Sequence, residues 1–186
     1  MALKATIHKV NLQIADMDRH YYQDHSLTIA RHPSETDERM MLRIAVFALH
    51  AHEQLKFTRG LSTDDEPDMW LKNLHGDIDL WIELGQPDEK RIRKACGQAQ
   101  EVWVYCYSGS SAELWWQQNQ GKLQRFGNLS VVNIPAKTSQ QLGTLAERNM
   151  SLHCSIQDKS LWIGNEETTI EIKPQVWKIK SDSKKT

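Results

Sequence analysis

The sequence IDLWIELG at residues 78–85 is mostly apolar, as is typical of an interior strand in a sheet that is covered on both faces. Pro87 ends this strand, and Asp88 can cap a helix that continues to about residue 99. The sequence EVWVYCY at residues 101–107 predicts a second strand, and residues 110–118 predict a second helix. The alternation of strands and helices indicates an α/β arrangement around a sheet.

Both ends of the chain have the pattern of β-strands. Apolar and polar residues alternate over residues 2–14 and return over residues 21–30, which predicts a long antiparallel hairpin. We expect one or two strands within residues 122–134, a short helix over 138–146 and strands over 151–156, 161–163 and 168–172. The fold class is therefore α/β (α+β), with a mixed central sheet flanked by helices and a β-rich side sheet from the N- and C-terminal segments. A length of 186 residues suits a single domain.

Composition excludes several classes of protein. The chain has 23 Lys and Arg residues against 24 Asp and Glu residues, a formal net charge of −1. This balance argues against a charge-driven nucleic-acid binder but is compatible with a local basic groove. No run approaches the ~20 apolar residues of a membrane span, and the cysteines (Cys96, Cys106 and Cys154) lie far apart with no Cys-x-x-Cys spacing. We expect a soluble cytoplasmic protein with no membrane association, no disulfide framework and buried cysteines.

A helix start precedes the central region. Residues 33–37 read PSETD, and Ser34 with an acid three positions later has the pattern of a capping box, which predicts a helix over about residues 34–53. Glu38 aligns on this helix with Leu42, Ala45 and Leu49, the stripe expected to face the core. This spacing points Glu38 toward the sheet.

Two further acids fall on neighbouring predicted strands. Asp68 begins a strand over residues 68–71, and Glu83 lies near the end of the strand over residues 78–84. A carboxylate within an apolar strand is costly to bury unless it is paired or binds a cation. Three converging acids with no matched arginine predict a hard divalent ion, Mg²⁺ or Mn²⁺, held by Glu38, Asp68 and Glu83. The alternative is that Glu38 is an exposed first-turn acid and Asp68 a turn residue.

The same region carries a family resemblance. The motifs resemble those of the YaeQ family of bacterial proteins, over nearly the whole chain, and that family is similar in fold to the PD-(D/E)xK, restriction-endonuclease-like nucleases. The resemblance implies a nuclease-like core at about residues 32–120, with Asp68 as the aspartate after proline, Glu83 as the second metal-binding acid and Glu38 as the first-helix glutamate. The motifs that carry it are PDMW at 67–70, Gly76, WIELGQPD at 81–88, Arg91, and Lys94-Ala95.

One position departs from the nuclease pattern. The lysine of that superfamily should follow the second acid by two residues, and here that position is Gly85. Gln86 and Lys94 are the substitutes that we favour, with Lys72, Lys90 and Arg91 as further candidates. The predicted catalytic residues are therefore Asp68, Glu83, Gln86 and Lys94.

Two functions follow from these observations. The first is a metal-dependent nuclease or phosphodiesterase that acts on DNA or RNA, in which the ion activates water for attack on a phosphate. The second is a catalytically inactive nuclease-like binding or regulatory protein with a nucleic-acid or protein partner, associated with nucleic acid or transcription. Gly85 and the near-zero net charge motivate the second.

Overall fold

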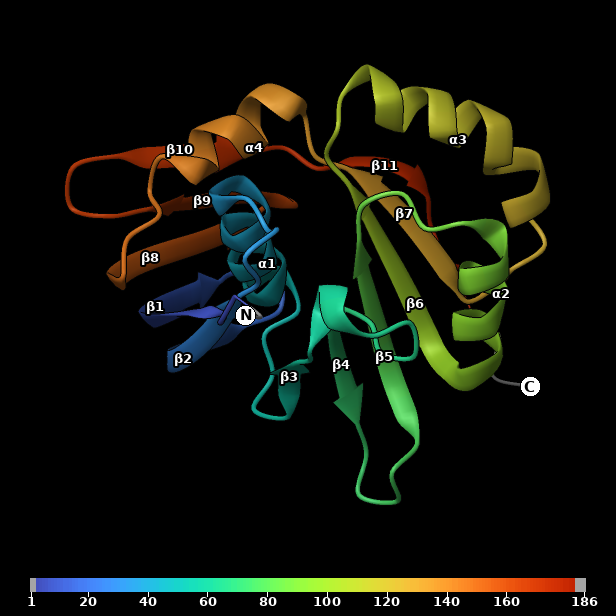
Figure 1. The fold of residues 1–186 in the computed structure, drawn as a ribbon, viewed down its shortest axis with the longest axis horizontal. Helices are drawn as coiled ribbons and strands as arrows, with labels where there is room; N and C mark the ends of the chain where they lie inside the picture. The colour runs from blue at the N-terminus through green and yellow to red at the C-terminus, as the bar shows by residue number, and fades with distance from the viewer. Residues whose placement is uncertain (1–2, 183–186) are drawn as a thin grey trace. The chain divides into compact units, whose positions relative to one another are not determined.

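The computed structural model describes residues 3–182. The chain forms two compact units, each built from two segments. Unit 1 comprises Met1–His52 and Ala136–Pro174, and unit 2 comprises Glu53–Pro135 and Gln175–Thr186. The colours of Figure 1 follow the residue number, so the two segments of each unit differ in colour.

Unit 1 contains a five-stranded mixed sheet (Figure 1). The strand order is β10-β9-β8-β1-β2, and β1 runs parallel to β8 whereas the other neighbours are antiparallel. Helices α1 and α4 pack against each other, and they contact β9 and β10 respectively. The elements are β1 (Thr6–Asp16), β2 (Tyr21–Arg31), α1 (Asp37–Leu49), α4 (Ala136–Gly143), β8 (Asn149–Gln157), β9 (Ser160–Gly164) and β10 (Thr169–Ile172).

The alternating pattern of the first strand explains how this sheet is buried on one face. Val10, Leu12 and Ile14 of β1 are buried, whereas Asn11 and Gln13 between them are exposed. This period of two is what a sheet with one covered face requires. The predicted hairpin is confirmed by the antiparallel pairing of β1 with β2, and the side sheet is confirmed because the C-terminal strands complete the same sheet.

The start of α1 differs from the prediction. Thr36 is the N-cap, since its hydroxyl accepts a hydrogen bond from the Arg39 backbone N–H at 3.1 Å. The expected cap, Ser34, instead pairs its hydroxyl with His32 Nδ1 at 2.6 Å. The prediction of a Ser34 cap is wrong because two hydroxyl residues two positions apart offer the same capping chemistry, and Ser34 is engaged locally.

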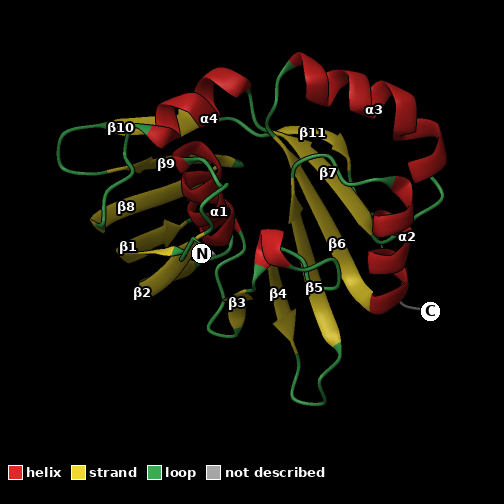
Figure 2. Cartoon of the chain, viewed as in Figure 1, coloured by secondary structure: helices red, strands yellow, loops and turns green. Residues whose placement is uncertain are grey.

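Unit 2 contains a six-stranded mixed sheet with order β11-β7-β6-β5-β4-β3. Strands β5, β6 and β7 are parallel neighbours, and β3, β4 and β11 pair antiparallel at the two sides. Figure 2 shows helices α2 and α3 as the connections between the parallel strands. The elements are β3 (Leu55–Phe57), the 3-10 turn η1 (Gly60–Ser62), β4 (Met69–Lys72), β5 (Ile78–Leu84), α2 (Glu89–Gln98), β6 (Ala99–Cys106), α3 (Ser110–Leu123), β7 (Leu129–Asn133) and β11 (Gln175–Lys178).

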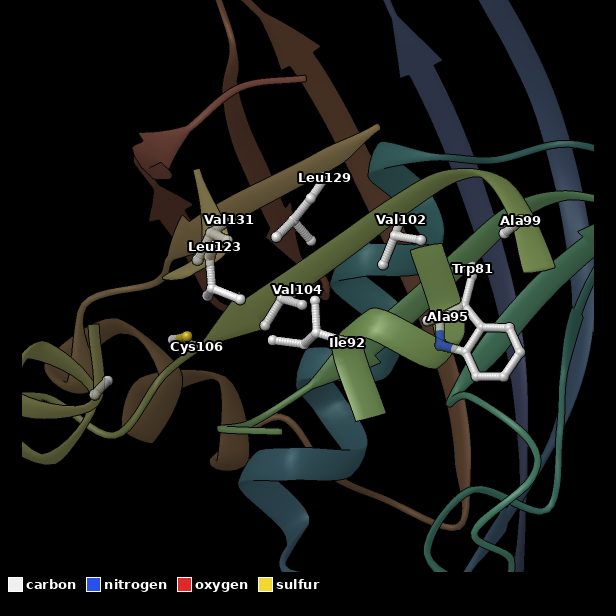
Figure 3. Close-up of a cluster of buried hydrophobic side chains, with 11 residues drawn as sticks. Trp81, Ile92, Ala95, Ala99, Val102, Val104, Cys106, Leu123, Leu129 and Val131 are labelled. Carbon is white, nitrogen blue, oxygen red and sulfur yellow. The ribbon is translucent and has the colours of Figure 1, made fainter. Parts of the chain in front are cut away.

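The core of unit 2 gathers where α2 and α3 meet the parallel strands (Figure 3). Trp81 of β5 is 2% exposed and packs in one cluster with Ile92 and Ala95, which lie on one face of α2. Val102 and Val104 of β6 complete the layer beneath the helix. Burial of a residue such as Ile92 contributes about 1.5–3 kcal/mol, so α2 is held on the sheet by its apolar face.

The buried cysteines agree with the sequence prediction at two of the three positions. Cys106 and Cys154 are buried and Cys96 is half-buried, and all three are free thiols. Burial raises the pKa of Cys106 to about 12 and that of Cys96 to about 11. They therefore behave as small apolar side chains.

We expect alanine substitutions at two glycines to change the free energy of unfolding in opposite directions. An alanine Cβ at Gly164 would overlap the backbone oxygen of Thr168, whereas one at Gly121 in α3 would meet no atom within 4 Å. We expect Gly164→Ala to lower the free energy of unfolding by at least about 2 kcal/mol because backbone must shift. We expect Gly121→Ala to raise it by about 0.5–1 kcal/mol, as for a glycine removed from a helix interior. Urea unfolding of the two variants beside the wild type measures both, and equal effects would contradict this packing of β10 on β9.

Candidate functional site

The register of β4 and β5 places Asp68 beside Glu83. Met69 pairs with Ile82, and the backbone N–H of Asp68 donates to the Ile82 carbonyl at 3.0 Å. Asp68 is 3% exposed, and its Oδ2 accepts a hydrogen bond from the Leu84 backbone N–H at 2.7 Å. The carboxylate of Asp68 thus binds the backbone at the end of β5, directly next to Glu83.

Glu83 is a buried acid with two polar partners. It is 6% exposed, and its Oε1 accepts hydrogen bonds from the Trp81 indole N–H and from Arg91 Nε, both at 2.8 Å. Burial raises the pKa of Glu83 above its ordinary value of 4.5, and the charge of Asp68 acts in the same direction. The guanidinium of Arg91 and the two hydrogen bonds oppose this effect on the Glu83 pKa without cancelling it.

All three nitrogens of the Arg91 guanidinium donate hydrogen bonds. Beside the ion pair with Glu83, its two terminal nitrogens donate to the carbonyl oxygens of Asp64 and Glu66, each at 2.8 Å. Its backbone N–H donates to the N-cap carboxylate of Asp88 at 2.7 Å. The expectation that the acids have no matched arginine is therefore wrong for Glu83. The first turn of α2 brings Arg91 back over the end of β5, a placement that spacing along the sequence does not reveal.

The two predicted substitutes for the missing lysine have other partners. Lys94 Nζ forms an ion pair with Asp65 Oδ1 at 2.6 Å, which lowers the pKa of the exposed Asp65 carboxyl. The side-chain amide of Gln86 lies 3.1 Å from the Ser111 hydroxyl. The cation that contacts the buried acid is Arg91 rather than Lys94, and Gln86 contacts the start of α3. The catalytic roles of Gln86 and Lys94 stay predictions.

Gly85 adopts a conformation that disfavours a lysine. Its φ is +114°, a region that L-residues rarely adopt, and its N–H donates to the Tyr105 carbonyl at 2.8 Å. Gly85 is therefore still hydrogen-bonded to β6, with a left-handed backbone, at the position where the nuclease resemblance places its lysine. A simple glycine-to-lysine replacement would strain the backbone here.

Glu38 lies in unit 1, where α4 engages it. Its Oε1 accepts a hydrogen bond from the Ser139 hydroxyl at 2.5 Å, and Gly143 approaches the Glu38 backbone closely. Within residues 3–182, no set of three or more His, Cys, Asp and Glu side chains is arranged to hold a metal ion. Asp68 and Glu83, called the acid pair below, do not fit a resident Mg²⁺ or Mn²⁺ ion while Arg91 is in contact with Glu83.

None of the helices within residues 3–182 has the length and apolar character needed to cross a bilayer.

The fold and the site together define the class of protein: a mixed α+β protein with a buried pair of carboxylates, one of them bound by arginine, at the carboxyl end of a parallel strand. The chain belongs to the YaeQ family, because residues 1–174 match the family described as YaeQ protein. The mixed α+β fold class and the membership of the YaeQ family, both predicted from the sequence, are confirmed. The similarity in fold to the PD-(D/E)xK nucleases stays a prediction.

Relatives and solved structures agree with this assignment. The chain is 50% identical over 177 residues to "Uncharacterized protein YaeQ" of Escherichia coli (strain K12), which covers 95% of this chain and 98% of that protein. It is equally similar to the protein of the same name from Salmonella typhi. The crystal structure of YaeQ protein from Xanthomonas axonopodis pv. citri matches with a TM-score of 0.91 and 45% identity, covering 95% of this chain and 99% of that one. The YaeQ structure from Pseudomonas syringae matches with a TM-score of 0.90 at 30% identity, covering 95% and 97%.

The ion pair predicts a large effect of Arg91→Ala on stability. Removing the guanidinium leaves Glu83 buried with one hydrogen-bond donor, so we expect the free energy of unfolding to fall by about 2–4 kcal/mol. In the Arg91→Ala/Glu83→Gln double variant this loss is smaller, because no unpaired charge remains. Chemical denaturation of the four proteins measures the coupling. Lys94→Ala serves as the control, with little expected effect because its ion pair is exposed; additive losses in the double variant would contradict the pairing.

The raised pKa of Glu83 predicts a pH dependence with a definite sign. The folded protein holds the Glu83 proton more tightly than the unfolded chain, so the contribution of Glu83 to stability is greatest at low pH and falls as pH rises from 4.5 through the raised pKa. Glu83→Gln cannot titrate, so we expect the stability of the wild type relative to this variant to fall over that window. Urea unfolding of both proteins from roughly pH 4 to pH 8 tests this. A difference that rises with pH would contradict it.

Proposed function

We propose that this protein is a nuclease-like protein that binds nucleic acid without cleaving it. The observation that carries the proposal is the ion pair between Arg91 and Glu83, which occupies the acid that the resemblance assigns to a metal. A carboxylate with a fixed guanidinium and an indole N–H on one oxygen is compensated by the protein itself. The acid pair then serves to hold α2 and the loop of residues 64–66 at the end of β5.

The backbone at Gly85 supports the same interpretation. A nuclease of the resembled superfamily uses a lysine at this position to orient the attacking water, and the positive φ of Gly85 disfavours any such side chain. Arg91 is engaged with two carbonyl oxygens as well as Glu83. It is therefore a positioning residue in this proposal rather than a replacement for that lysine.

The outer face of α2 supplies cations for a nucleic-acid partner. Lys90 and Arg93 are exposed on this helix, next to the arginine that binds Glu83. Local basic groups of this kind bind phosphates without regard to sequence. The modest number of cations is consistent with a chain whose net charge is −1.

A second candidate, metal-dependent hydrolysis of nucleic acid, is favoured by one specific observation. The site contains two buried carboxylates and one guanidinium, so their formal charges leave one negative charge. A Mg²⁺ or Mn²⁺ ion would bind there only if Arg91 moved away from Glu83, and Arg91→Ala should then strengthen ion binding.

The experiment separates the two functions with one set of proteins. Fluorescence anisotropy with labelled DNA and RNA, single- and double-stranded, is recorded in EDTA, in Mg²⁺ and in Mn²⁺, and the products are run on a denaturing gel. We expect the wild type to bind in EDTA, Asp68→Asn to retain that binding, and every substrate to stay intact.

Two results would overturn the proposal. Cleavage by the wild type that disappears in both Asp68→Asn and Glu83→Gln establishes the hydrolytic function instead. The absence of binding to every nucleic acid, with wild-type unfolding behaviour intact, rejects a nucleic-acid partner altogether.

A further inference from the structure

A separate pocket of unit 2 lies at the β3–β4 edge of its sheet. Its volume is about 530 Å³, within the rough range of 300–1,000 Å³ usual for small-molecule sites. None of the six residues that line it is acidic, and two are lysines. They are Gln54, Lys56, Trp70, Lys72, Asn73 and Leu74.

The strand register places both lysines next to Trp70 on one face of the sheet. Lys56 of β3 pairs directly with Trp70 of β4, and Lys72 lies two residues further along β4. Side chains two apart on a strand share a face, as do directly paired residues on neighbouring strands. The pocket therefore combines one indole with two exposed ammonium groups on one face of the sheet.

The indole of Trp70 contacts a second indole and a lysine ammonium. It packs edge to face against the buried Trp81, with ring centroids 6.1 Å apart. The Lys72 ammonium lies 3.8 Å from the Trp70 ring centroid. The half-buried ring is thus packed against Trp81 on one side and lies beneath the exposed Lys72 side chain.

Polar groups close one end of the pocket. The Asn73 side-chain amide donates hydrogen bonds to Asp77 and Asp79, each at 3.3 Å. These carboxylates therefore face the amide in the β4–β5 turn, and the lysines keep the pocket itself positively charged.

We propose that this pocket binds one base and the adjoining phosphates of a single-stranded nucleic acid. The inference rests on the proposed function and names the part of the surface that carries it. An aromatic face takes any base by stacking, and ammonium groups on either side take the phosphates. A base within a duplex is already stacked on its neighbours and does not reach the ring, which selects single strands.

Binding exchanges one contact for three. The base takes the place of the Lys72 ammonium over the Trp70 ring, and the released ammonium pairs with a phosphate. Lys56 contacts the phosphate on the other side. Because Trp81 both supports Trp70 and donates to Glu83, the pocket and the acid pair share one rigid part of the sheet.

The test measures the affinity of a labelled oligothymidylate of about 12 nucleotides. Trp70→Leu keeps an apolar side chain against Trp81 and removes the stacking surface, so we expect the affinity to fall roughly tenfold or more. Lys56→Gln/Lys72→Gln should lower the slope of log affinity against log salt by about 1.4, two phosphate contacts at ~0.7 each. Lys122→Gln, an exposed lysine on α3, is the matched control and should change neither quantity. Unfolding midpoints of all variants establish that they are folded.

The outcomes distinguish this inference from the function on which it rests. A wild type that binds no nucleic acid rejects both. A wild type that binds while the folded Trp70→Leu and double-lysine variants bind equally well overturns only the pocket. Preference for a duplex of the same sequence, or equal affinity for thymidine monophosphate, also overturns it, because the occupant would then be a duplex or a free nucleotide.

Discussion

A buried glutamate must be compensated, and much of unit 2 is arranged around that requirement. Glu83 lies in an apolar strand at 6% exposure, where an isolated carboxylate is too costly to keep. The structure supplies Arg91 and the Trp81 indole to one of its oxygens. Arg91 in turn binds the carbonyl oxygens of Asp64 and Glu66. One charge thus ties together β5, the first turn of α2 and the loop that leads to Asp68.

The same arrangement decides which chemistry the acid pair can perform. Two neighbouring carboxylates at the end of a strand are suitable ligands for a divalent ion, but a guanidinium at 2.8 Å competes for the same oxygen. Asp68 and Glu83 occupy the positions that the resemblance to nucleases predicts for metal-binding acids, whereas the Arg91 partner of Glu83 and the backbone of Gly85 do not fit that pattern. The binding function that we propose needs no metal ion at these acids.

Trp81 connects the core of unit 2 to the acid pair and to the basic pocket. It packs in the apolar cluster beneath α2, donates to Glu83 and supports Trp70 in the pocket. A tryptophan combines a large apolar surface with one hydrogen-bond donor, so it can fill a core and satisfy a buried acid together. In the binding pocket that we propose, the packing of Trp70 on Trp81 positions the indole before a ligand binds, and such preorganisation lowers the cost of association.

Local patterns in the sequence determined most of the elements. Alternation over residues 2–14 and 21–30 predicted the hairpin of β1 and β2. The apolar strand before Asp88 predicted β5, its end and the cap of α2, because these features depend on neighbours in the chain. The short edge strands β3 and β11 were not predicted, and α3 continues to Leu123 beyond its predicted end. The family motif located Asp68 and Glu83 as a pair. Only the tertiary structure decided their partners: Arg91 reaches Glu83 because α2 packs back on the sheet, and Glu38 pairs with Ser139, which lies 101 residues away in the chain. Such pairings depend on which elements meet in space, a property that the spacing of residues along one strand or helix does not contain.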